Sequence, residues 1–133
     1  MEVVFPATDE ALADVNAFVE SHLEEAGCKP GTMMKIMVAV EELFVNVAHY
    51  AYNEPGGEVH VSLDFEGDNM ILSMKDTGTP FNPLEKADPD VGLGAEDRQI
   101  GGLGIFMVKK TMDELKYDYV DGCNIVTIIH KIK

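Results

Sequence analysis

A change in hydrophobic period near residue 53 constrains the fold of this chain more than any other feature of its sequence. Before it, apolar residues recur at helical spacing from Pro30 to about Tyr52. After the break, apolar and polar residues alternate in two short runs between Val59 and Met74, which is typical of two half-buried strands in an antiparallel hairpin. The helical stripe consists of Ile36, Val40, Leu43, Val47 and Tyr50. A helix must therefore pack on a sheet.

The flanking segments predict more elements of both kinds. We expect an edge strand at 3–5, a helix from the N-cap Thr8 to Gly27, a helix that opens at Gly102, and a hairpin formed by 117–120 and 125–132 that turns at Asp121 and Gly122. The expected fold is α+β, a two-layer sandwich with a mixed, mostly antiparallel sheet and about three helices on one face. Its 133 residues are expected to form a single domain, 1–133.

Charge and composition exclude several classes of function. Asp and Glu number 24 against 10 Lys and Arg, and the resulting net charge of -14 repels nucleic acid and anionic lipid, so a basic protein partner fits better. No signal sequence and no apolar run of about 20 residues is present, so we expect a soluble, cytoplasmic protein. Cys28 and Cys123 lack metal-ligand spacing and are expected to be reduced thiols.

Glu42 and Asn46 interrupt the apolar helix, four residues apart and therefore on one face. They could simply be solvated residues of its outer face. However, Asn is unfavourable inside a helix because its side chain competes for backbone groups. An amide oxygen can bind a hard divalent cation, and a carboxylate one turn away can deprotonate a hydroxyl or water. The pair is a candidate metal ligand and base.

Two glycine-containing segments follow the helix. Asp76, Thr77 and Gly78 end the second hairpin strand and could be only a turn, or could place a carboxylate against the amine of adenine with the backbone close to the base. Gly101, Gly102 and Gly104 precede a helix and could be a hinge or a phosphate-binding helix N-terminus. The non-periodic stretch between them, from Thr77 to Gly101, is typical of a lid or binding loop.

Taken in order, these signals resemble a known family. A helix with ExxxN, a strand ending in DxGxPF, and a loop leading into GGLGIxxV are similar to the N, G1 and G2 boxes of the GHKL ATPases, which share the Bergerat-type fold of histidine kinases. The sequences EELFVNVAHYAY, DTGTPFNP and GGLGIFMVKKTMDELKY more closely resemble the anti-sigma regulatory factor branch, which consists of serine/threonine kinases. The resemblance spans nearly the whole chain.

The resemblance implies roles for individual residues. It implies that Glu42 is the catalytic base, that Asn46 binds Mg2+, and that Arg98 is a lid arginine that stabilises the transferring phosphate. The other implied ATP-binding residues are Asp76 and Gly78 at adenine, Gly102 and Gly104 at the phosphates, and Thr127 in support of adenine recognition.

The implied activity is ATP-dependent phosphorylation of a serine or threonine on an anti-sigma antagonist-type protein, with a sigma factor as a second partner and homodimerisation by analogy. Two alternatives remain open at this point. One is an ATP-binding regulatory module that binds a protein without phosphorylating it. The other is a structural interaction domain that binds no nucleotide.

Overall fold

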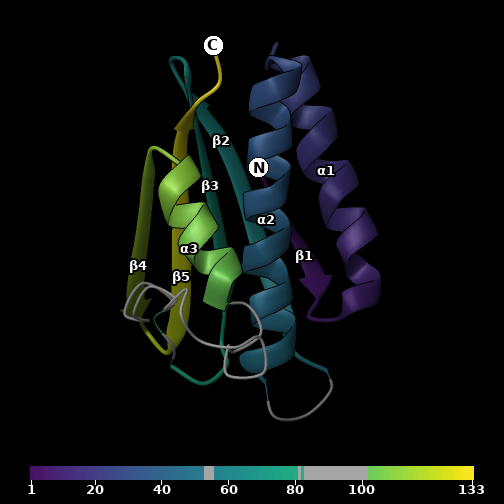
Figure 1. The fold of residues 1–133 in the computed structure, drawn as a ribbon. Coiled ribbons are helices and arrows are strands. Elements are labelled where there is room, and N and C mark those ends of the chain that lie inside the picture. Colours follow the sequence, from purple (N-terminus) through teal and green to yellow (C-terminus); the bar gives the residue numbers. More distant parts are fainter. Residues whose placement is uncertain (53–55, 81, 83–101) are drawn as a thin grey trace.

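Five strands form a single open sheet, and the helices cover one of its faces (Figure 1). This computed structural model describes residues 1–52, 56–80, 82 and 102–133. The strand order is β1-β2-β3-β5-β4, and every described pairing is antiparallel. The strands are β1 (Glu2–Pro6), β2 (Glu58–Glu66), β3 (Asn69–Asp76), β4 (Glu114–Val120) and β5 (Cys123–Lys131).

The helical layer contains the 3-10 turn η1 (Asp9–Ala11) and the helices α1 (Leu12–Glu25), α2 (Pro30–Tyr50) and α3 (Gly102–Thr111). Thr8 caps η1 by accepting a hydrogen bond from the Ala11 N–H, as its position before the acidic first turn predicts. The predicted α+β class and the placement of the helices on one face are confirmed, with a sheet that is antiparallel throughout its described part.

Helix α2 is the central element of the helical layer. Pro30 occupies its first turn, where the missing N–H of proline needs no partner. Its core face includes Ile36, Val40 and Phe44, all fully buried against the sheet and neighbouring helices. The helix ends at Tyr50 rather than Tyr52, and Tyr50 is 43% exposed rather than part of the core, because it lines the mouth of a pocket.

The β4–β5 hairpin forms one edge of the sheet. Its two-residue turn has positive φ at both positions, 52° at Asp121 and 79° at Gly122, the conformation that suits the twist of an antiparallel hairpin. Strand β4 begins at Glu114 rather than Tyr117. The sequence of this edge strand shows only a weak alternation of apolar and polar residues. Residues 114–116, which the predicted strand left out, belong to β4 because they pair with β5.

The register of β3 and β5 determines where polar side chains enter the layer between sheet and helices. Every second residue of each strand, such as Leu72 in β3 and Ile128 in β5, is buried toward the helices. The same phase buries Asp76 and Asn124, which are Cα partners in the last pairing of the two strands. An apolar core therefore ends in a buried polar pair.

Candidate functional site

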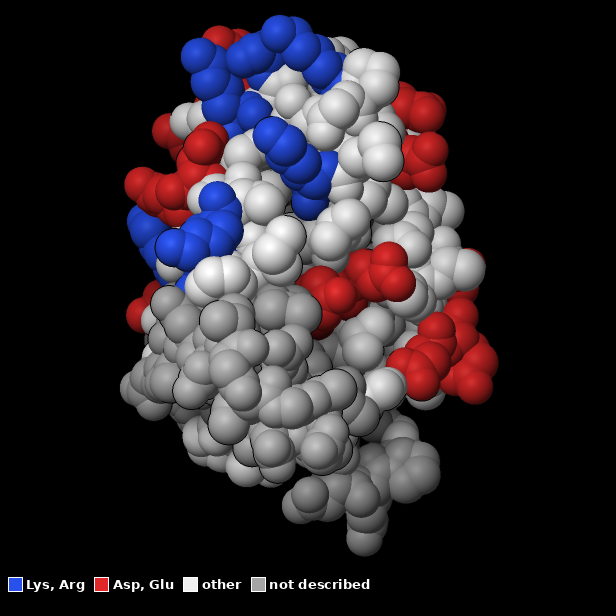
Figure 2. Space-filling model, viewed as in Figure 1, with Lys and Arg blue, Asp and Glu red and all other residues white. Residues whose placement is uncertain are grey.

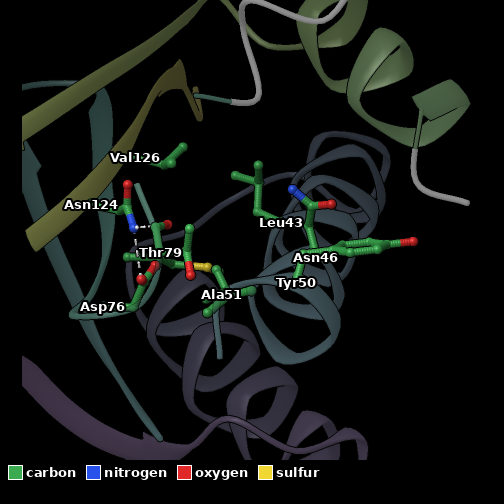
Figure 3. Close-up of a pocket in the computed structure, with 10 residues that line it drawn as sticks. Leu43, Asn46, Tyr50, Ala51, Asp76, Thr79, Asn124 and Val126 are labelled. Atoms are coloured by element: carbon green, nitrogen blue, oxygen red, sulfur yellow. Dashed lines mark hydrogen bonds between the residues drawn. The ribbon is translucent and has the colours of Figure 1, made fainter. Parts of the chain in front are cut away.

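A pocket opens at this polar end of the core, between the last turns of α2 and the ends of β3 and β5 (Figure 3). Its apolar wall consists of Leu43, Val47, Ala51, Met74 and Val126, and its polar lining of Asn46, Tyr50, Asp76, Thr79 and Asn124. The cavity itself measures about 20 Å³, which is room for one or two water molecules.

Asp76 is the most buried charged side chain of the pocket, with 4% of its surface exposed. Its Oδ1 accepts hydrogen bonds from the Gly78 N–H at 2.9 Å and from Asn124 Nδ2 at 3.0 Å. These two hydrogen bonds fix the orientation of the carboxylate. Within the described part of the chain, Oδ2 receives no hydrogen bond and remains an acceptor for a ligand donor.

Asn124 is a site residue that the sequence did not reveal. Its Nδ2 donates to both Asp76 Oδ1 and the Thr79 carbonyl at 3.0 Å (Figure 3), while its Oδ1 accepts a short hydrogen bond from the Tyr117 hydroxyl. Asn is depleted in strands, so a buried Asn in β5 indicates a specific role for its side chain. The available signal was the strand register, which places Asn124 opposite Asp76.

Asn46 approaches the pocket from α2. It is 6% exposed, and its Oδ1 is buried with no hydrogen-bond partner among the described residues. An unpaired buried carbonyl oxygen costs about 1–3 kcal/mol, which a ligand donor or a cation could recover. Glu42 lies one helical turn before Asn46, half-buried, and does not line the pocket as it stands.

Gly78 fits tightly against the end of α2. A Cβ on this residue would lie 2.1 Å from the Ala51 carbonyl oxygen, and the next residue, Thr79, donates its N–H to that same oxygen at 2.7 Å. The Tyr52 hydroxyl also joins the two segments, since it donates to the Glu58 carbonyl and accepts from the Thr77 N–H. The turn after Asp76 is thus held against the helix that carries Asn46.

Thr127 lies outside this arrangement. It belongs to the set of β5 residues that alternate with the buried ones, and its hydroxyl is 3.1 Å from that of Ser73 on the sheet face away from the helices. A side chain on that face cannot reach a ligand held between sheet and helices. The β5 residue that contacts Asp76 in the pocket is Asn124.

Of the remaining predicted site residues, the structure describes Gly102 and Gly104. Helix α3 begins at Gly102 and includes Gly104, so both glycines are in its first turn. Arg98, Gly101 and most of the loop from Thr77 to Gly101 lie outside the described residues. Among the described residues, no group of three or more His, Cys, Asp and Glu side chains could hold a metal by itself, and no helix is long and apolar enough to span a membrane. Both cysteines are free thiols.

Comparison with known sequences identifies similar proteins. The family model for the histidine kinase-like ATPase domain matches residues 5–130. The chain is 29% identical to the serine-protein kinase RsbW of Listeria monocytogenes over 126 residues, which cover 91% of this chain and 80% of that protein. It is 23% identical to the protein of the same name from Bacillus mycoides over 130 residues, which cover 95% and 81%.

Solved structures support the fold. The crystal structure of the RsbU and RsbW domains of a Mycobacterium tuberculosis protein is similar with a TM-score of 0.70 at 20% identity, over 99% of this chain and 31% of that one. The histidine kinase AdeS of Acinetobacter baumannii is similar with a TM-score of 0.55 at 16% identity, over 98% of this chain and 68% of that one.

Proposed function

Because this chain belongs to the family of histidine kinase-like ATPase domains, we propose that it binds ATP with Mg2+ in the pocket between α2 and the sheet and phosphorylates a serine or threonine of a protein partner. The observation that carries the proposal is the pairing of a buried, oriented carboxylate at Asp76 with a buried, unpaired amide oxygen at Asn46 in one pocket. Neither polar group is needed to pack the apolar residues at this end of the core.

The polar groups fit the two ends of the nucleotide. Asp76 offers an acceptor for the exocyclic amine of adenine, and the apolar wall that includes Met74 and Val126 suits the faces of a purine. The first turn of α3, with Gly102 and Gly104, offers backbone N–H groups to phosphate.

Asn46 fits a divalent cation that is shared with phosphate oxygens. Its Oδ1 is the kind of hard ligand that Mg2+ accepts, and Mg2+ commonly binds through one or two protein groups plus substrate phosphates. When bound, the cation neutralises phosphate charge as it develops in the transfer. The proposed cation would give the Asn46 oxygen the partner that no described residue provides.

Glu42 is proposed as the base. From one turn before Asn46, its carboxylate accepts the proton of the attacking hydroxyl as the bond to the γ-phosphorus forms and the bond to ADP breaks. Arg98 is proposed to stabilise the transferring phosphate from the lid. The serine-protein kinase name of the relatives supports a protein substrate. We propose an anti-sigma antagonist-type protein as that substrate, a sigma factor as a second partner, and a cytoplasmic location.

The leading alternative is an ATP-dependent binding module without kinase activity. Glu42 favours the kinase, since a binding module needs no base near the phosphates. The two functions are separated by incubating the chain with γ-labelled ATP, Mg2+ and purified antagonist-type domains. Transfer of label to the domain supports the kinase, whereas ATP binding without transfer to any of them supports the module.

Two variants test the residue roles. Asp76→Asn should weaken ATP binding by about tenfold or more, because the carboxylate acceptor becomes an amide, and calorimetric titration measures the loss. Glu42→Ala should leave ATP affinity unchanged and lower the rate of transfer by about a hundredfold or more, as expected for loss of a general base. Equal ATP affinity in Asp76→Asn contradicts the adenine site, and undiminished transfer in Glu42→Ala contradicts the base.

A further inference from the structure

A second concave surface lies between α2 and α3, away from the nucleotide pocket. It is a groove of about 230 Å³, with walls formed by Met34, Lys35 and Val38 of α2 and Met107 and Thr111 of α3. Three of its side chains are large, apolar and exposed: Met34 is 71% exposed, Val38 54% and Met107 48%. Their clustering in one groove is the property of a protein-binding surface rather than of scattered surface apolar residues.

The walls of this groove differ in charge from the rest of the chain. Among the described residues that line the groove, the one charged side chain is Lys35, in a chain that has 24 acidic residues. Helix α3 carries the exposed Lys110 nearby, and Glu41 and Glu42 follow Val38 by about one turn on α2. Figure 2 shows blue basic side chains among white ones on the upper part of this face, with red acidic side chains at its edges and near its middle.

The shape and charge together indicate the kind of partner. Met34 and Val38, one turn apart on α2, and Met107 on α3 are the exposed apolar side chains of a groove that accepts the apolar stripe of a third helix. Lys35 and Lys110 attract acidic side chains on the flanks of that helix, while the net charge of -14 repels acidic surfaces elsewhere. We propose that the α2–α3 groove binds an amphipathic, acidic helix of a partner protein.

The proposed surface goes beyond the nucleotide site and does not depend on kinase activity. It is nevertheless built on the same two helices: α2 carries Val38 and, two turns later, Asn46, and α3 begins at Gly102 and carries Met107. A helix bound in the groove therefore contacts α2, the helix that also lines the proposed nucleotide pocket.

The first experiment selects helices without assuming a partner. The full chain is used as bait for a displayed library of helical peptides that share one apolar stripe and carry Glu, Ser or Lys at the flanking positions. Enrichment of Glu-flanked peptides is expected. Enrichment of Lys-flanked or Ser-flanked peptides, or no enrichment at all, overturns the proposal.

The second experiment locates the binding. Met34→Ala and Met107→Ala should each weaken the selected acidic peptide by about five- to tenfold, as central apolar contacts do, in fluorescence anisotropy titrations. Lys35→Glu should weaken it by about two- to fivefold, the range for an exposed charge pair. Lys131→Glu, with the same charge change on an exposed residue of β5, should leave it unchanged.

Thermal unfolding and sedimentation velocity complete the test of the groove. Thermal unfolding of every variant should match the unchanged chain, because the replaced side chains are exposed and pack little. Equal peptide affinity in the groove variants and in Lys131→Glu places the peptide elsewhere and overturns the proposal. Sedimentation velocity tests another occupant: self-association that Met107→Ala abolishes would make a second copy of this chain the natural ligand and would also overturn it.

Discussion

Asp76 shows how far a single residue depends on its neighbours. A carboxylate that is 4% exposed is costly unless it is hydrogen-bonded, and here the Gly78 N–H and the Asn124 amide both donate to one of its oxygens. Asn124 is held in turn by the Tyr117 hydroxyl and the Thr79 carbonyl. The Asp76 carboxylate is thus oriented by a chain of hydrogen bonds as well as by its own strand.

This network makes a prediction for Asn124. Replacing it by Ala removes one donor to Asp76 and leaves the Tyr117 hydroxyl without this acceptor, so ATP affinity should fall by about tenfold and unfolding free energy by about 1–3 kcal/mol. Isothermal titration and denaturant unfolding measure the two effects. Thr127→Ala is the control on the same strand, and should leave ATP affinity unchanged because it lies on the other sheet face. An equal loss in both variants would contradict the role of Asn124.

Gly78 provides a steric test. Replacement by Ala would place a Cβ 2.1 Å from the Ala51 carbonyl oxygen, so the turn must move and its Thr79–Ala51 hydrogen bond must lengthen. We expect a loss of about 1–3 kcal/mol in unfolding free energy together with weaker ATP binding. Gly31→Ala in α2 makes the same chemical change where nothing lies within 4 Å and should not destabilise the protein. Unchanged stability in Gly78→Ala would show that the turn does not pack on α2 in this way.

At the scale of elements, α2 and the β4–β5 hairpin have the largest share in the site. Helix α2 supplies the core through Phe44, the pocket through Asn46 and one wall of the groove through Val38, each from a different part of its surface or length. The hairpin supplies Tyr117 and Asn124 from its two strands. Its turn therefore affects the geometry of the pocket as well as the edge of the sheet.

Two substitutions in the β4–β5 turn are predicted to change the stability of the protein in opposite directions. Gly122 has φ of 79°, where a Cβ is strained although nothing lies near it, so Gly122→Ala should lower unfolding free energy by about 1 kcal/mol. Asp121 has φ of 52°, and Asp121→Asn should raise stability slightly because Asn-Gly suits this turn best. Thermal unfolding compares the two variants. A fall in both would mean that Asp121 makes a contribution other than its backbone conformation.

At the scale of the whole molecule, the net charge does not describe every part of the surface, because folding places acidic and basic side chains in different regions. A net charge of -14 favours a basic partner for most of the surface, whereas the face formed by α2 and α3 combines lysines with exposed apolar side chains. One small chain can therefore present two different kinds of interaction surface. The groove and the pocket beside Asp76 are both lined by residues of α2.

Much of this molecule follows from local sequence patterns. The periodicities around Val40 and Leu72, the proline that opens α2 and the Asp121–Gly122 turn gave the elements and their order, because these signals act over a few neighbouring residues. The motifs around Asn46, Asp76 and Gly102 indicated a family that the match over residues 5–130 confirms. These features are determined by the sequence alone.

The tertiary structure decided what depends on pairing between distant segments. Only the β3–β5 register brings Asn124 to Asp76, 48 residues away along the chain, and turns Thr127 to the opposite face. Only helix packing joins Val38 to Met107 in one groove. Local patterns specify which residues are apolar, turn-forming or charged. They do not specify which of these residues meet, because that is determined by the register of paired strands and the packing of the two layers.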